Sequence, residues 1–303
     1  MTQEADLLID RRRLKRRLAL WRVVAIVALV AVVLAVFSRF DRLTERDHVA
    51  RLEVGGLIVE DDATIEALAD LVDDPHAKAL IVRIDSPGGT FVGGESLYNA
   101  LLKVAAKKPV VAVMGTVATS AGYMTAIAAD RIFAHEGTIT GSIGVLVQTT
   151  DITGLLGKLG VTAEAIKSAP LKATPSPFEP LTDEARAATQ AIIDDMYGLF
   201  TDMVAERRGF DERRVRELAD GRVYSGRQAL QRNLIDAIGD ESDARVWLAE
   251  TKDIPESLPV RDVEINRPAE EWLPRISSLA GKMLLSERLT LDGLISVWHP
   301  APE

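Results

Sequence analysis

The chain has 303 residues, of which 47% are hydrophobic, and its formal net charge is −9. This length and composition allow one large domain or two smaller ones, and the acidic balance argues against a general nucleic-acid-binding protein, which would present a basic surface. There is no cysteine and there are only four histidines, none in a close pair, so disulfides, a cysteine nucleophile and thiolate metal sites are excluded. We therefore expect no metal and no other cofactor.

The first predicted element is a transmembrane anchor over residues 18–38. Arg22 is the only charged residue in this segment, and twenty helical residues span about 30 Å, the thickness of the hydrocarbon core of a bilayer. A buried core helix is disfavoured because such helices are rarely apolar on every face. A cleaved signal peptide would also contain an apolar run, but this run is long for one and no clear A-x-A site follows it. The sequence thus favours an anchor that is not cleaved.

The charges beside the anchor predict its orientation. Six basic residues precede it, whereas the segment after it has both signs of charge. The positive-inside rule then predicts a single-pass protein of the cell inner membrane. A basic tail, residues 1–17, lies in the cytoplasm, and the chain after the anchor lies on the outer, periplasmic side.

Strands and helices alternate through residues 46–250, which we expect to form one catalytic domain. Short apolar runs rich in β-branched residues are typical of buried parallel strands, and the segments between them have helical periodicity. The pattern predicts an α/β fold with right-handed crossovers. The expected strands are 52–60, 79–85, 109–115, 131–134 and 141–148, and the expected helices are 62–73, 93–107, one beginning near Ser120, 182–207 with Thr182 as N-cap, and one with a capping box from Ser225 to Gln228.

The last part of the chain, residues 251–303, differs in composition from the domain before it. Residues 254–274 contain four prolines and several charges, which predicts an extended linker. Residues 276–297 have the apolar spacing of an amphipathic helix. A helix that packs on the domain and a helix that contacts a membrane or a partner are equally compatible with this pattern.

Two predicted turns from a strand into a helix contain residues suited to catalysis. The first, from Asp85 to Gly89, ends in a glycine pair, which lets main-chain N–H groups point into open space at the edge where ligands of α/β sheets bind. The second leads into Ser120, whose next residue, Ala121, could join Gly88 or Gly89 in holding an oxyanion. Each turn also has a structural interpretation: a tight turn needs glycine, and a serine often caps a helix.

A nucleophilic serine needs a base, and the sequence offers two kinds. His135 is the nearest histidine along the chain, but it follows a strand and we expect it to lie away from Ser120. The proline-rich segment 165–182 contains Lys167 and Lys172. A lysine can act as a base where burial among apolar groups favours its neutral form, although most lysines face solvent.

Several motifs resemble those of signal peptide peptidase A-type serine proteases, a family within the superfamily that shares the Clp protease and crotonase fold. The matches follow the same order over roughly residues 50–250, and the predicted single-pass anchor agrees with them. They are RIDSPGG (83–89), ATSAGYMTAIAADRIFA (118–134), TGSIGV (140–145), IKSAPLKATPSPFEPLT (166–182) and, more weakly, DGRVYSGRQALQRNLIDAIG (220–239).

This resemblance implies a Ser–Lys dyad. The family serine falls on Ser120, and the family lysine falls on Lys172, the second lysine of a K-S-x-x-x-K pattern, rather than on Lys167. The resemblance further implies that Gly88 and Ala121 supply the N–H groups of the oxyanion hole. Two positions depart from the family: Ala121 stands where glycine is frequent but still donates an N–H, and Asn233 also replaces a frequent glycine but tolerates a positive φ.

The function implied is that of a membrane-anchored serine endopeptidase that cuts hydrophobic peptides, above all cleaved signal peptides. The family also implies a homo-oligomer that encloses its active sites, with peptides and the membrane as partners and no nucleic acid. The main competing function is that of a membrane-protein quality-control peptidase of the same family. An intact Ser120 and Lys172 disfavour both a crotonase-type acyl-CoA enzyme and a non-catalytic membrane scaffold.

Overall fold

A computed structural model describes residues 21–22, 24–26, 28–29, 46–266 and 295–297. The chain divides into two compact units, Met1–Arg46 and Asp47–Glu303. The described residues between 21 and 29 are helical, and most of the predicted anchor and the whole of the basic tail lie outside the described residues. Within the described ranges, no helix combines the length and the apolar character needed to cross a membrane.

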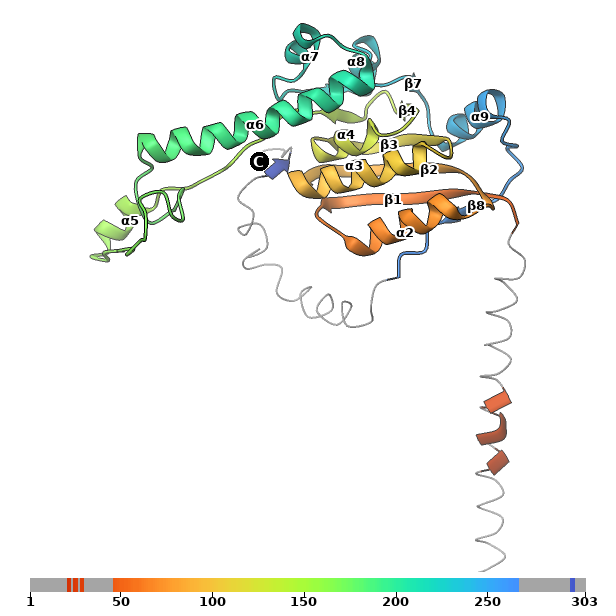
Figure 1. Ribbon diagram of the computed structural model, residues 1–303, viewed down its shortest axis with the longest axis horizontal. Helices are drawn as coiled ribbons and strands as arrows, with labels where there is room; N and C mark the ends of the chain where they lie inside the picture. Colours follow the sequence, from red (N-terminus) through yellow and green to blue (C-terminus); the bar gives the residue numbers. More distant parts are fainter. Residues whose placement is uncertain (1–20, 23, 27, 30–45, 267–294, 298–303) are drawn as a thin grey trace, which may run out of the picture. The chain divides into compact units, whose positions relative to one another are not determined.

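The second unit is built on a nine-stranded sheet, counted over the described residues (Figure 1). Its main order is β6-β5-β3-β2-β1-β8, while β4 pairs with β3 and β7, and β9 pairs with β2. The strands are β1 (His48–Ile58), β2 (Ala77–Thr90), β3 (Val110–Thr119), β4 (Arg131–Ala134), β5 (Ile139–Gly141), β6 (Val223–Ser225), β7 (Ala237–Ile238), β8 (Val260–Asp262) and β9 (Ile295–Val297).

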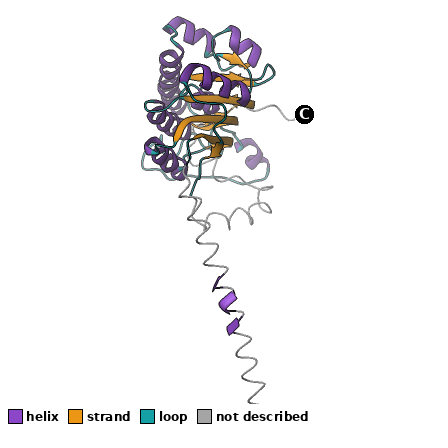
Figure 2. Cartoon of the chain, turned by 90° about the vertical axis from the view of Figure 1, so that its right-hand side faces the viewer, coloured by secondary structure: helices purple, strands orange, loops and turns teal. Residues whose placement is uncertain are grey.

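The predicted α/β class is confirmed, because the pairings of β1, β2, β3 and β4 with one another are all parallel. Helices lie on both sides of this sheet (Figure 2). Leu68, Leu101 and Met124, from three helices, share the large core on one face, while Ala244 and Leu248 cover the other face. The helices are α2 (Asp62–Asp73), α3 (Phe91–Ala105), α4 (Ala121–Ala126), α5 (Thr153–Lys158), α6 (Asp183–Arg208), α7 (Glu212–Leu218), α8 (Gly226–Gln231) and α9 (Glu241–Lys252).

A bulge in β3 directs the chain toward the second of the two turns. Ile84 pairs with Met114, but Ser86, two residues later on β2, pairs with Ala118, four residues later on β3. β3 pairs with β4 before the bulge and with β5 after it. Bulges bend a strand and change the direction of the side chains that follow. This bulge therefore brings the end of β3 beside the end of β2.

An extended arm, residues 142–182, connects β5 to α6. The expected strand over 141–148 is wrong apart from Gly141 and an isolated bridge at Leu146, and residues 142–182 contain one short helix, α5, within an otherwise irregular path. The 26-residue helix α6 then returns to the sheet, with Thr182 as the predicted N-cap. Figure 1 shows α5 and its neighbouring loops at the outer end of α6, away from the sheet.

The C-terminal part confirms one prediction and differs from two others. The capping box of Ser225 and Gln228 is present at α8, as expected. The expected linker over 254–274, however, contains β8, which pairs in parallel with β1. The expected helix over 276–297 ends instead in β9, a strand antiparallel to the end of β2, and its other residues lie outside the described ranges. Pairing with an open sheet edge satisfies main-chain groups that an isolated strand would leave to water.

Candidate active site

Ser120 lies in a strained turn between β3 and α4. Its main chain has φ 57° and ψ −120°, a positive φ that is rare for a residue with a Cβ. The Ser120 N–H donates to the Gly141 carbonyl at 2.9 Å, and its carbonyl accepts from the Met124 N–H at 2.9 Å. The side chain makes no capping hydrogen bond. The N-cap interpretation of this hydroxyl is therefore wrong, although the residue does occupy the N-cap position.

The surroundings of Ser120 are closely packed. The serine is 1% exposed, and Ala118, Ala121 and Tyr123 are fully buried. The Tyr123 hydroxyl donates to the Leu234 carbonyl at 2.9 Å, and burial raises the pKa of this phenol. Gly122 approaches β2 so closely that a Cβ on it would lie 3.0 Å from the Ser86 carbonyl oxygen. Side chains of the core thus hold the turn and its serine in place.

The turn Asp85–Gly89, which we name the oxyanion turn, lies next to this serine. Gly88 has φ 114°, and a Cβ on Gly89 would meet the Ile58 carbonyl oxygen at 1.7 Å, so both positions require glycine. The Ser86 hydroxyl donates to the Gly56 carbonyl at 2.6 Å and accepts from the Gly88 N–H at 3.1 Å. The Gly88 N–H, one predicted donor to an oxyanion, is therefore already engaged by Ser86 in this structure.

Side chains join the bulge of β3 to its neighbours. Asp85 accepts from the Val117 N–H at 3.0 Å, and Thr138 donates to the Gly115 carbonyl at 2.7 Å. Because ladder hydrogen bonds are interrupted at a bulge, these side chains satisfy main-chain groups that the neighbouring strands do not. The bulge is thus a stable feature of the fold, and it makes the two predicted turns neighbours.

The predicted base lies apart from this serine. Lys172 is exposed, in the segment between α5 and α6, which Figure 1 shows away from α4. Lys167, in the same segment, is partly buried and forms an ion pair with Glu179. The structure therefore joins Ser120 to the oxyanion turn but does not bring Lys172 to Ser120 within one chain. The burial that would favour a neutral lysine is also not provided by this chain alone.

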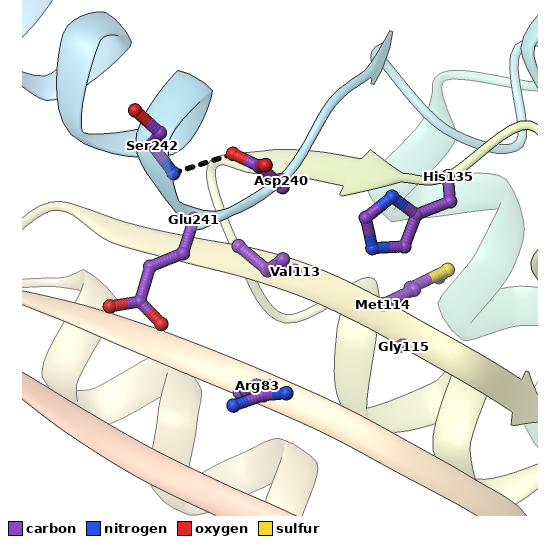
Figure 3. A pocket seen from close by; sticks show the side chains of 8 residues that line it. All are labelled: Arg83, Val113, Met114, Gly115, His135, Asp240, Glu241 and Ser242. Atoms are coloured by element: carbon purple, nitrogen blue, oxygen red, sulfur yellow. Dashed lines mark hydrogen bonds between the residues drawn. The ribbon is translucent and has the colours of Figure 1, made fainter.

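His135 lies on the sheet face that α9 covers. Its ring lines a pocket together with Arg83, Gly115 and the first residues of α9 (Figure 3). Because α4 packs against the other face, His135 is not placed to act on Ser120. In the part of the chain that the structure describes, no group of three or more histidine or acidic side chains is arranged to hold a metal ion.

Comparisons with known proteins agree with this architecture. The sequence profile of peptidase family S49 matches residues 103–255, about half of the chain. A putative protease of Synechocystis is 37% identical over 255 residues, which cover 82% of this chain and 92% of that protein. The chloroplastic serine protease SPPA of Arabidopsis thaliana is 33% identical over 264 residues, 82% of this chain but 39% of that protein.

Two further matches are shorter or more distant. A putative signal peptide peptidase SppA of Enterococcus faecium is 35% identical over 196 residues, 64% of this chain and 56% of that protein. Among solved structures, a membrane-bound stomatin-specific protease aligns over 73% of this chain and 99% of its own, with a TM-score of 0.45 and 15% identity. The family profile and the relatives together show that the chain belongs to peptidase family S49 and is a serine protease.

Proposed function

We propose that this protein is a membrane-anchored endopeptidase that cuts apolar peptides, chiefly cleaved signal peptides, with Ser120 as nucleophile and Lys172 as general base. The observation that carries the proposal is the strained, non-capping Ser120 beside the oxyanion turn. The name of the Enterococcus relative supports the substrate class. The apolar segment 18–38 supports a site next to a bilayer, with the catalytic unit on the periplasmic side.

The proposed reaction uses only side chains and main-chain groups of this protein, together with water. Neutral Lys172 removes the proton of the Ser120 hydroxyl as its oxygen attacks the peptide carbonyl, and the resulting oxyanion is held by main-chain N–H groups. Ala121 begins α4, so its N–H has no partner within the helix and is suited to this task. Lys172 then gives its proton to the leaving amine, and water hydrolyses the acyl-enzyme by the same route.

The edge of β2 supports an extended peptide as the substrate. Residues Gly88–Thr90 pair in antiparallel fashion with β9, so the edge at the oxyanion turn can hold an added strand, and a peptide bound there would take the place of β9. A peptide bound by strand addition obtains affinity from main-chain hydrogen bonds, which every sequence can make. Its side chains would then alternate between the two faces of the sheet.

A second copy of the chain is our proposal for the source of Lys172. The arm that contains it exposes several apolar side chains, among them Leu159 at 67% and Ile166 at 99%. Apolar surface of this kind usually marks an interface. If the arm packs on a neighbouring copy, the same contact buries these side chains and brings Lys172 to Ser120 of that copy. The homo-oligomer expected from the sequence then becomes a requirement of catalysis.

The test is a substrate trap in native membranes. Ser120→Ala removes the nucleophile, so we expect peptides to remain bound and mass spectrometry to identify them as apolar signal-peptide segments. A serine-directed fluorophosphonate should label the unmodified protein and not the variant. Fragments from the interior of membrane proteins would instead favour the quality-control function. Full peptidase activity of the Ser120→Ala variant would overturn the proposed nucleophile.

A further inference from the structure

Thr119, the residue directly before Ser120, makes a contact that the proposed reaction does not use. Its side chain is fully buried, and its hydroxyl donates to the Pro87 carbonyl at 2.9 Å. This hydrogen bond joins the turn that contains Ser120 to the oxyanion turn. It therefore joins the two main-chain segments whose relative position decides whether an oxyanion formed at Ser120 meets its donors.

Both ends of the peptide unit between Pro87 and Gly88 are held. The carbonyl oxygen of Pro87 and the N–H of Gly88 belong to one planar group, so fixing one fixes the direction of the other. Thr119 holds the oxygen, and Ser86 accepts from the N–H at 3.1 Å. Ser86 is in turn anchored to the Gly56 carbonyl on β1. The plane is thus fixed between two strands.

A turn that ends in a glycine pair needs such a constraint. Gly88 has a positive φ, and glycine samples more main-chain conformations than other residues, so the amides of a free Gly-Gly turn would change direction. Oxyanion stabilisation depends on donors that reorganise little, and a fixed turn limits how far the Gly88 N–H, which Ser86 engages in this structure, has to reorient. The same set of hydrogen bonds also constrains the proposed nucleophile, because Thr119 is bonded directly to Ser120.

We propose that Thr119 is a positioning residue, which sets the oxyanion turn against Ser120 and thereby stabilises the transition state. The inference rests on the proposed role of Ser120. It concerns the orientation of main-chain donors and not substrate binding. Loss of the hydroxyl should therefore lower kcat and leave KM nearly unchanged.

The experiment compares three variants of the full chain in detergent with a fluorogenic apolar peptide. Thr119→Val keeps the shape and removes the hydroxyl, and Thr119→Ser keeps the hydroxyl. Thr140→Val is the matched control, because Thr140 is also fully buried and donates to a carbonyl, that of Ala118, at 2.7 Å, without reaching the oxyanion turn. Thermal unfolding of each variant reports the structural cost separately from the kinetics.

We expect Thr119→Val to lose about 10- to 100-fold in kcat, less than the loss of a whole oxyanion donor. Thr119→Ser and Thr140→Val should stay within about threefold of the unmodified protein. A peptide aldehyde, which forms a tetrahedral adduct on the serine, should lose affinity for Thr119→Val in parallel with kcat/KM. If Thr119→Val does not fold, Thr119→Ala adds no bulk and carries the same expectation.

Two results would overturn the proposal. One is an equal loss of kcat in Thr119→Val and Thr140→Val, which would indicate a merely structural hydroxyl. The other is a Thr119→Ser variant as slow as Thr119→Val. Retained activity in Ser120→Ala is a separate outcome, since it would reject the proposed function whatever the Thr119 variants do.

Discussion

The two halves of the proposed dyad lie in very different surroundings. Ser120 is 1% exposed in a strained turn, and hydrogen bonds from Thr119 and Ser86 hold the oxyanion turn next to it. Lys172 is exposed in an arm that has little regular structure. Under the proposed function, one folded chain holds the nucleophile and the oxyanion turn by itself, while the base becomes available only in a larger arrangement. Regulation by assembly would follow directly from this division.

The largest effect is expected from the two lysines of the arm, because their substitution tests which residue acts as the base. Lys172→Ala should lower kcat by about a thousandfold, the contribution of a positioned general base, as measured with a fluorogenic peptide. Lys167→Ala is the matched control: its ion pair with Glu179 is half-buried and local, so its loss should leave most of the activity. A large loss in Lys167→Ala alone would show that the wrong lysine has been assigned.

Mixing inactive variants decides which chain supplies the lysine. Ser120→Ala and Lys172→Ala each lack one half of the dyad. If a neighbouring copy provides the base, mixed oligomers contain some sites with both residues, and activity should return when the two variants are combined. If the arm folds back within its own chain, every site in the mixture still lacks one residue. An inactive mixture, with exchange of subunits confirmed, would therefore place the dyad in one chain.

Ser86→Ala tests the half of the site that the chain completes by itself. The Ser86 hydroxyl holds the Gly88 N–H, and its removal leaves this amide free to turn. Because Ser86 helps to fix the turn, we expect kcat to fall by about tenfold, which is less than the effect of losing one oxyanion donor. If the Gly88 N–H itself must leave Ser86 to bind the oxyanion, the variant should be at least as active as the unmodified protein. Steady-state kinetics separate the two.

The pH dependence of activity tests the proposed role of Lys172 as the general base. A lysine acts as a base only when it is neutral, so kcat/KM should rise with pH, by about tenfold per unit on the acidic side of the optimum, because one proton must leave. The optimum should be alkaline. A profile that is flat from mildly acidic pH upward would contradict a lysine base. The same profile in Thr119→Val should keep its shape, since that variant changes the oxyanion turn and not the base.

Much of the fold could be predicted because its elements follow local patterns. The helix over 62–73, the strand over 131–134 and the capping box of Ser225 depend on spacing within a few residues, and all three are present. The bulge of β3 could not be predicted, because it depends on which strand pairs with β3 on either side of Gly115. The sequence shows nothing of this change of partner. Thr119 and Ser86 were overlooked for the same reason: their partners lie about thirty residues away.

The proposed serine is easier to place than the proposed base for a physical reason. Ser120 directly follows β3 and the oxyanion turn lies in the neighbouring β2, so sheet register brings them together once the strands are known. Lys172 lies in a segment that the core does not position, and a lysine there is as compatible with solvent as with catalysis. The resemblance to a known family selects it, but no pattern of burial or spacing does.

The smallest expected effect concerns Tyr123 in α4, the helix that begins directly after Ser120. Tyr123→Phe removes the hydroxyl that donates to the buried Leu234 carbonyl, so the free energy of unfolding should fall by about 1–3 kcal/mol. Lys103→Ala, at an exposed position in the last turn of α3, is a control for which we expect almost no change. Denaturant titrations near neutral pH measure both.

The pH dependence of that difference provides a second check. Burial raises the pKa of the Tyr123 phenol above the value of 10.0 that an unfolded chain retains. Above pH 10 the unfolded state therefore releases a proton that the folded state keeps, so the unmodified protein should lose stability with rising pH, and Tyr123→Phe should lose about 1.4 kcal/mol less per pH unit. The stability gap between the two proteins should narrow there. A constant gap would show that the Tyr123 phenol has the same pKa in the folded and the unfolded state. The packing around Ser120 would then be looser than its burial and hydrogen bonds indicate.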